Sequence, residues 1–248
     1  MSDINLERLS PVVAGKIEPF LREILEGHEG NIHSIHVVGS SLTPDYDEKT
    51  SDVNSIVVLK MMDLKFVEFL APLGKRYKKK GIAAPLIMTP NYITGSRDVF
   101  PIEFLNFKLI HETVVGEDIL KDIEIDAADL RHQCEREIKS KLIGLRQGYI
   151  SSMGDRKILT DGFVNSIAGY IPLFRGIIVL MKKDPPVRRG EVITALSDAT
   201  GVTADIFGKV LDIKKGKLKP DRDELNTIFE DYYRATEKIG TLVDEHRI

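Results

Sequence analysis

Apolar residues at helical spacing open the chain and predict a helix over residues 4–27, which Pro11 could divide. A strand is then predicted over residues 32–38, and an apolar run at 55–59 predicts a second strand that is buried on both faces. The rest of this half is predicted to hold a helix over 64–80 ending at Gly81, a short strand over 84–88 and a longer strand over 99–109.

Beyond about residue 126 every periodic segment has helical spacing. Five helices are predicted there, with Pro172 as a kink in the second: 127–150, 159–183, 189–199, 204–214 and 221–245. The fold class is therefore α/β (α+β). We expect a small mixed-sheet domain over residues 1–122, followed by an all-helical bundle domain over residues 123–248.

The most apolar segment, residues 163–181, carries Arg175 near its centre. A central arginine costs about 2.5–3.5 kcal/mol on membrane-insertion scales, so a buried core helix is expected rather than a membrane span. The first residues are acidic and lack an apolar core, so no signal peptide is expected. Cys134 is the single cysteine, which excludes an internal disulfide and favours a reducing, cytoplasmic location.

Composition narrows the classes of partner. A hydrophobic fraction of 42% and a charged fraction of 29% are those of a soluble globular protein. The net charge of −3 disfavours nucleic acid as a partner, because binding a long phosphate backbone needs many cationic contacts. The basic run at 75–80 is expected to be a solvated helix end, where the helix dipole favours cations.

A Gly-Ser turn and a spaced acidic strand are the main candidates for chemistry. The first predicted strand ends at Gly39 and Ser40, and the second begins beside Asp52 and Asn54. Residues i and i+2 of a strand project from the same face, so the carboxylate and the amide point the same way. Small residues in a turn let backbone N–H groups approach phosphate oxygens, and carboxylate oxygens hold Mg²⁺. This layout suits a nucleotide phosphate and its metal.

The same residues resemble the motif of the polymerase-beta-like nucleotidyltransferase superfamily, in its bacterial, kanamycin-nucleotidyltransferase-like members with a helical C-terminal domain. The matching positions are Val38, Gly39 and Ser40, a gap of eleven residues, Asp52 and Val53, and a later carboxylate at Glu103. The resemblance covers roughly residues 30–120.

The resemblance implies transfer of a nucleotidyl group from a nucleoside triphosphate to an acceptor that the sequence does not identify. It implies Asp52 and Glu103 as catalytic residues, and Asp52, Asn54 and Glu103 as ligands of Mg²⁺. It also implies that Gly39, Ser40 and Ser41 bind the nucleotide. A homodimer is a further expectation from these relatives.

Asn54 departs from the motif, since it stands where the superfamily has a second carboxylate. A neutral amide lowers the negative charge available to a metal ion. Two alternatives to an enzyme therefore remain open. One is a nucleotide-binding or regulatory module with little turnover, and the other is a partner-binding module of the toxin–antitoxin type.

Overall fold

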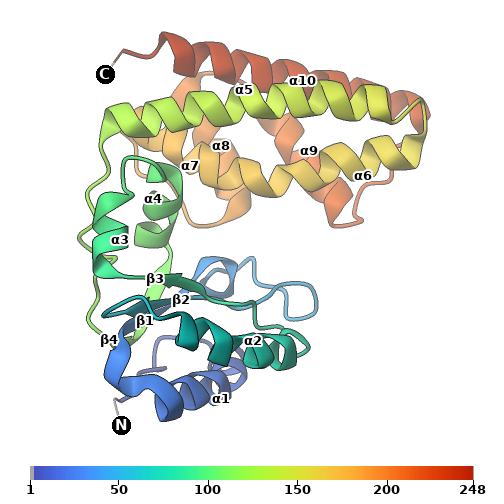
Figure 1. Ribbon diagram of the computed structural model, residues 1–248. Coiled ribbons are helices and arrows are strands. Elements are labelled where there is room, and N and C mark those ends of the chain that lie inside the picture. Colours follow the sequence, from blue (N-terminus) through green and yellow to red (C-terminus); the bar gives the residue numbers. More distant parts are fainter. Residues whose placement is uncertain (1–2, 248) are drawn as a thin grey trace. The chain divides into compact units, whose positions relative to one another are not determined.

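The computed structural model describes residues 3–247, which divide into two compact units. The N-terminal unit comprises the chain up to Asp98 together with Phe104–Glu124, and the helical unit comprises Val99–Glu103 together with residues from Ile125 onward. A small mixed sheet with flanking helices and a set of further helices confirm the predicted fold class (Figure 1). The division into domains at residues 122 and 123 stays a prediction.

The first helix, α1, spans Pro11–His28 and is shorter than the sequence predicts. Pro11 begins this helix instead of dividing it, because proline has no N–H to lose at the first helical position. Ser10 is the N-cap, and its side chain accepts a hydrogen bond from the amide of Val13. Residues 3–9 are not helical, and the Asn5 amide donates to the carbonyl of Val114 at 2.9 Å.

The sheet has four strands in the order β3-β2-β1-β4. Both neighbours of β1 run antiparallel to it, whereas β2 and β3 are parallel. The strands are β1 (Ile32–Val38), β2 (Asn54–Leu59), β3 (Leu86–Met88) and β4 (His111–Gly116). The three strands predicted up to residue 88 are confirmed, with β3 shorter than expected.

One face of the sheet packs on α1 and on α2 (Leu64–Lys78). Ile35 and Val37 of β1 and Val57 of β2 contribute to this core, and none of their side chains is accessible to solvent. The alternate positions of β1 project from the opposite face, which therefore carries Asn54 and the polar residues described below.

The prediction of a strand over residues 99–109 is wrong. Pro101–Leu109 form helix α4, Pro90–Gly95 form a short helix α3, and the fourth strand is β4. A short, mostly apolar segment of this kind fits a buried helix as well as a buried strand. Pro101 stands at the first position of α4, where proline favours a helix start.

The helical unit confirms the predicted helices, with one break. Its elements are α5 (Ala127–Ser151), α6 (Arg156–Ser166), η3 (Ile167–Gly169), α7 (Tyr170–Leu180), α8 (Arg189–Thr200), α9 (Asp205–Lys214) and α10 (Arg222–Glu245). The predicted helix over 159–183 is two helices joined by the turn η3. Pro172 explains the break, because it cannot donate to the carbonyl of Ala168 and its ring crowds that carbonyl.

Within residues 3–247, the stretch Arg156–Leu180 is long and apolar enough to cross a membrane by length and composition. Of its most apolar window, 67% is buried inside the structure, which is typical of a core helix in a soluble protein. Arg175 is buried within α7, where its guanidinium donates to the carbonyls of Pro186 and Val187.

Candidate functional site

The end of β1 and the start of β2 lie side by side, because Val38 pairs with Asn54 in the antiparallel register. Gly39 follows Val38 with a φ of +81°, a left-handed conformation that glycine adopts without strain. A Cβ added to Gly39 would lie 3.9 Å from Nδ2 of Asn54. The structure therefore brings the predicted Gly-Ser turn and the predicted Asp-x-Asn strand together at one end of the paired strands β1 and β2.

The turn itself, η2 (Gly39–Leu42), is held from both ends. The Gly39 amide donates to the carbonyl of Ile110 at 3.2 Å, which ties the turn to the residue before β4. The amide and the hydroxyl of Thr43 both donate to the carbonyl of Ser40, each at 3.0 Å. The amide of Ser40 belongs to the first positions of a 3₁₀ turn, which lack acceptors within that turn.

Ser41 is buried, and its hydroxyl is one of two buried side-chain polar atoms without a hydrogen-bond partner among the described residues. The other is the hydroxyl of Ser55. Ser55 alternates with Asn54 along β2, so it projects from the opposite face and does not belong to the same site. An unpaired buried hydroxyl is costly, so a polar partner for the Ser41 hydroxyl would be stabilising.

Asp52 and Asn54 are both exposed, while Val53 between them is fully buried. Val53 is anchored by hydrogen bonds with Gly81 and Ala83, its amide donating at 2.8 Å and its carbonyl accepting at 3.0 Å. This anchor fixes the two flanking residues in extended chain, with both side chains directed away from the core. The side-chain amide of Asn54 donates one long hydrogen bond, 3.4 Å, to the backbone carbonyl of Asp52.

The sequence predicted that Glu103 lies on a strand, but it lies in the first turn of α4. Its carboxylate accepts a hydrogen bond of 2.7 Å from the side chain of Gln133 in α5. Glu103 and Gln133 belong to the helical unit, whereas Asp52 and Asn54 belong to the N-terminal unit. The roles of Glu103 in catalysis and in Mg²⁺ binding stay predictions.

The protein donors for a metal ion at the Asp52–Asn54 edge are one carboxylate and one amide. Across the described residues 3–247, no group of three or more His, Cys, Asp and Glu side chains is placed to hold a metal ion. Mg²⁺ commonly binds through one or two carboxylates together with substrate phosphates and water. The donor set therefore fits a single Mg²⁺ that arrives with a triphosphate, and it does not fit a metal ion held by protein alone.

A buried polar network lies on the same face of the sheet, behind the turn. His36 bonds to the hydroxyl of Ser34 at 2.9 Å and to that of Thr113 in β4 at 2.8 Å. Burial, with His111 nearby, lowers the pKa of His36 to about 4, so its ring is neutral near pH 7. The network joins β1 to β4 and so supports the strand end that carries Gly39.

His111 and Asp118 form a second polar contact beside this network. Nε2 of His111 lies 2.9 Å from the carboxylate of Asp118, and its Nδ1 lies 2.8 Å from the carbonyl of Phe107. Partial burial of Asp118 opposes its ionisation, but the hydrogen bonds from His111 and from the Lys121 amide, together with the electrostatic attraction of His111, outweigh it and lower the pKa of this carboxyl. In the sequence, only the alternation of Ser34 and His36 along one strand face could have revealed this polar layer.

No protein-family model matches the chain, and neither does any curated protein. One similar solved structure is the crystal structure of spectinomycin adenyltransferase AAD(9) from Enterococcus faecialis with ATP and spectinomycin. That match has a TM-score of 0.52 at 13% sequence identity, and it covers 91% of this chain and 98% of that chain. At this identity the likeness shows the fold alone, which is a nucleotidyltransferase-like fold.

Proposed function

We propose that this protein binds a nucleoside triphosphate with one Mg²⁺ and transfers its nucleotidyl group to an acceptor. The observation that carries the proposal is the pairing of Val38 with Asn54, which sets the Gly39–Leu42 turn beside Asn54, two residues along the chain from Asp52. The nucleotidyltransferase-like fold supports the same assignment.

The turn would hold the phosphates. The backbone amide of Ser40 suits a phosphate oxygen, and the buried Ser41 hydroxyl is a further donor without a partner. Gly39 keeps side-chain atoms away from this surface and leaves room beside Asn54. These groups would orient the triphosphate, and orientation together with charge neutralisation supplies most of the catalysis in phosphoryl-type transfer.

Asp52 would hold the Mg²⁺, which when bound neutralises phosphate charge and fixes the phosphate geometry. Asn54 would contribute a neutral oxygen ligand or orient the phosphates. Because the protein supplies a single carboxylate here, we expect metal binding to depend on the nucleotide: the nucleotide-free protein should bind Mg²⁺ only weakly.

The test combines nucleotide binding with label transfer. Calorimetry with ATP, GTP, CTP and UTP, each with and without Mg²⁺, should give binding that magnesium strengthens. Asp52→Asn should remove the magnesium dependence, whereas Glu68→Gln, an exposed carboxylate of α2, should leave it unchanged. Labelled nucleotide should pass to an acceptor when candidate acceptors are supplied. Absence of both binding and transfer would refute the proposal.

A second candidate is a nucleotide-binding module without turnover, which Asn54 favours because it removes a carboxylate from the edge. The two candidates differ in their response to Asn54→Asp. A weakened enzyme should transfer nucleotide faster after this substitution, because the second carboxylate is restored. A binding module should show no transfer before or after it, and its nucleotide binding should tolerate removal of Mg²⁺.

A further inference from the structure

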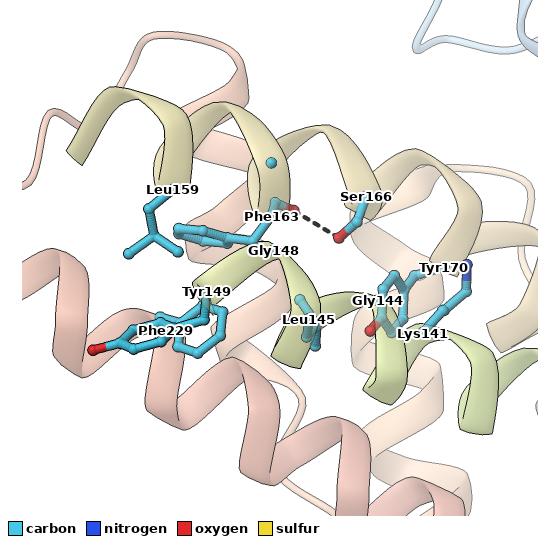
Figure 2. Close-up of a pocket in the computed structure, with 11 residues that line it drawn as sticks. Lys141, Gly144, Leu145, Gly148, Tyr149, Leu159, Phe163, Ser166, Tyr170 and Phe229 are labelled. Atoms are coloured by element: carbon cyan, nitrogen blue, oxygen red, sulfur yellow. Dashed lines mark hydrogen bonds between the residues drawn. The ribbon is translucent and has the colours of Figure 1, made fainter. Parts of the chain in front are cut away.

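The helical unit contains a cavity of about 260 Å³ between α5 and α6, closed on one side by α10 (Figure 2). This is larger than the engineered cavities of about 150 Å³ that bind benzene. Aromatic and aliphatic side chains make up most of the wall, namely Leu145, Tyr149, Leu159, Phe163, Tyr170 and Phe229. None of the residues of the Gly-Ser turn lines it, so this cavity is separate from the proposed nucleotide site.

Three glycines create the space. Gly144 and Gly148 lie one turn apart on α5, and Gly162 faces the cavity from α6. A Cβ added at any of the three would meet no heavy atom within 4 Å. Packing against a neighbour therefore does not explain these glycines, although glycine is unfavourable inside a helix. Their common effect is to keep the cavity open.

Lys141 is the cationic group of the cavity wall. Figure 2 shows its side chain beside Tyr170. The amine lies 4.8 Å from the centre of the Tyr170 ring, and a Cβ on Gly169 would lie 3.0 Å from it. Burial lowers the pKa of Lys141, and Glu137 opposes this effect from a distance. Among the described residues no carboxylate oxygen lies within 4.0 Å of this amine, so an aromatic face is the main partner of the charge.

The other polar groups at this end of the cavity already have partners. The Ser166 hydroxyl bonds to the carbonyl of Phe163 at 2.6 Å and to the hydroxyl of Tyr232 at 2.9 Å. The Tyr170 hydroxyl bonds to Thr236 at 3.1 Å. At this end of the cavity, the polar group left for a ligand is the amine of Lys141.

We propose that this cavity binds a small aromatic carboxylate, with the ring between α5 and α6 and the carboxylate on Lys141. A ring suits the aromatic wall, where Tyr149 and Phe163 lie 5.0 and 5.8 Å from Phe229 between ring centres. A carboxylate supplies the oxygen partner that the amine lacks, in a charge-assisted hydrogen bond. A neutral apolar ligand would leave the amine without that partner.

The probes are 2-naphthoate and its neutral analogue 2-naphthamide, titrated into the full chain by calorimetry and thermal-shift assay. The wild type should bind 2-naphthoate at one site and bind 2-naphthamide about tenfold or more weakly. Lys141→Met should remove this preference while leaving 2-naphthamide binding nearly unchanged. Equal binding of the two probes to the wild type, or no binding of either, would overturn the proposal.

The glycines provide a variant that blocks the cavity without weakening the helix. Gly148→Ala adds a methyl group where the ligand would lie and raises helix propensity, so loss of binding could not be attributed to unfolding. Gly208→Ala is the matched control, because Gly208 lies in α9, outside the cavity wall, and also meets no atom within 4 Å. Gly148→Ala should lose 2-naphthoate binding and Gly208→Ala should keep it; undiminished binding to Gly148→Ala would contradict the proposal.

The same measurements distinguish an aromatic carboxylate from a second copy of the chain as the occupant of the cavity. If a second copy of the chain filled the cavity, the protein would form a concentration-dependent dimer that Gly148→Ala disrupts, and 2-naphthoate would not bind. That result would overturn the aromatic carboxylate. Failure of nucleotide binding would leave this proposal unaffected, since no residue is shared between the two sites.

Discussion

At the scale of single residues, Gly39 allows the clearest test of the turn. Its φ of +81° is a conformation in which a Cβ crowds the following carbonyl. We expect Gly39→Ala to lower the free energy of unfolding by about 1–2 kcal/mol and to weaken nucleotide binding. Urea denaturation and calorimetry with ATP would measure the two effects separately.

Gly15→Ala is the matched control for that substitution. Gly15 lies inside α1, and a Cβ there would meet no atom within 4 Å. Alanine should therefore stabilise the helix by about 0.5–1 kcal/mol. Unchanged stability and nucleotide binding in Gly39→Ala would contradict the role given to the left-handed turn.

His36 makes the N-terminal unit sensitive to acid. Its pKa is about 4 in the folded chain, mainly through burial, and about 6.5 when unfolded. The unfolded state therefore binds a proton first as the pH falls, and the stability contributed by neutral His36 is full above pH 6.5 and declines towards pH 4. Between pH 7 and pH 5 this amounts to about 2 kcal/mol.

Urea denaturation of the wild type and of His36→Gln at pH 7 and pH 5 would measure this loss. The carboxylates titrate in both proteins, so the difference between the two pH dependences isolates His36. The groups near its ring are His111, Asp118 and His33. We expect the variant to be less stable at pH 7 but to lose less stability on acidification, and equal losses in both proteins would exclude His36 as the cause.

At the scale of elements, the spacing of apolar residues predicted helices correctly where the helical period continued over many residues. Four of the five helices predicted after residue 126 are single helices in the structure, and the fifth, over 159–183, is divided at η3. Residues 99–109 are mostly apolar and short, and the sequence pattern did not distinguish helix from strand there. β4 begins with His111 and Glu112 and gave little strand signal of its own.

The candidate site was predictable to the same extent. The nearness of Gly39 to Asn54 follows from a strand, a turn and an adjacent strand, which are local patterns. Glu103 was placed near the site because residues 99–109 were predicted to form a strand of the sheet. These residues include helix α4, so that reason for its position no longer holds. Gln133, which binds the Glu103 carboxylate, lies thirty positions away along the chain and has no sequence signal.

Arg175 tests how α7 is anchored. Its buried guanidinium donates to the carbonyls of Pro186 at 3.2 Å and Val187 at 2.7 Å, which fixes the segment before α8. Arg175→Met keeps an apolar stem but loses these charge-assisted bonds, so we expect a loss of roughly 2–3 kcal/mol in urea denaturation. Arg188→Met is the control, because Arg188 and its partner Glu191 are both exposed, and its effect should stay within about 0.5 kcal/mol. A loss that small in Arg175→Met would contradict the anchoring role.

At the scale of the whole molecule, α4 belongs to both units, since Glu103 falls in the helical unit and Phe104 in the N-terminal unit. We therefore expect the two units to unfold together. Leu21→Ala in the core of the N-terminal unit should cost about 2–5 kcal/mol, and each 1.4 kcal/mol should raise the open population about tenfold.

The reactivity of Cys134 would measure whether the helical unit opens together with the N-terminal unit. It is fully buried beside Gly176 in the helical unit, and burial, with Glu137 and Glu103 nearby, raises the pKa of its thiol. Leu21→Ala should accelerate reaction of Cys134 with a thiol reagent under native conditions, and Val12→Ala, at an exposed position of α1, should not. An unchanged reaction rate in Leu21→Ala would show that the units open independently.

The segment before α1 has a consequence for solubility. β4 ends the strand order, so its outer backbone groups could pair with a strand of another molecule. The Asn5 amide occupies the carbonyl of Val114 at that edge, and Ile4 and Leu6 pack against the core beside it. These few non-helical residues cover the outer edge of β4. Removing them would expose backbone groups of β4 that could pair with a strand of another molecule and so promote aggregation.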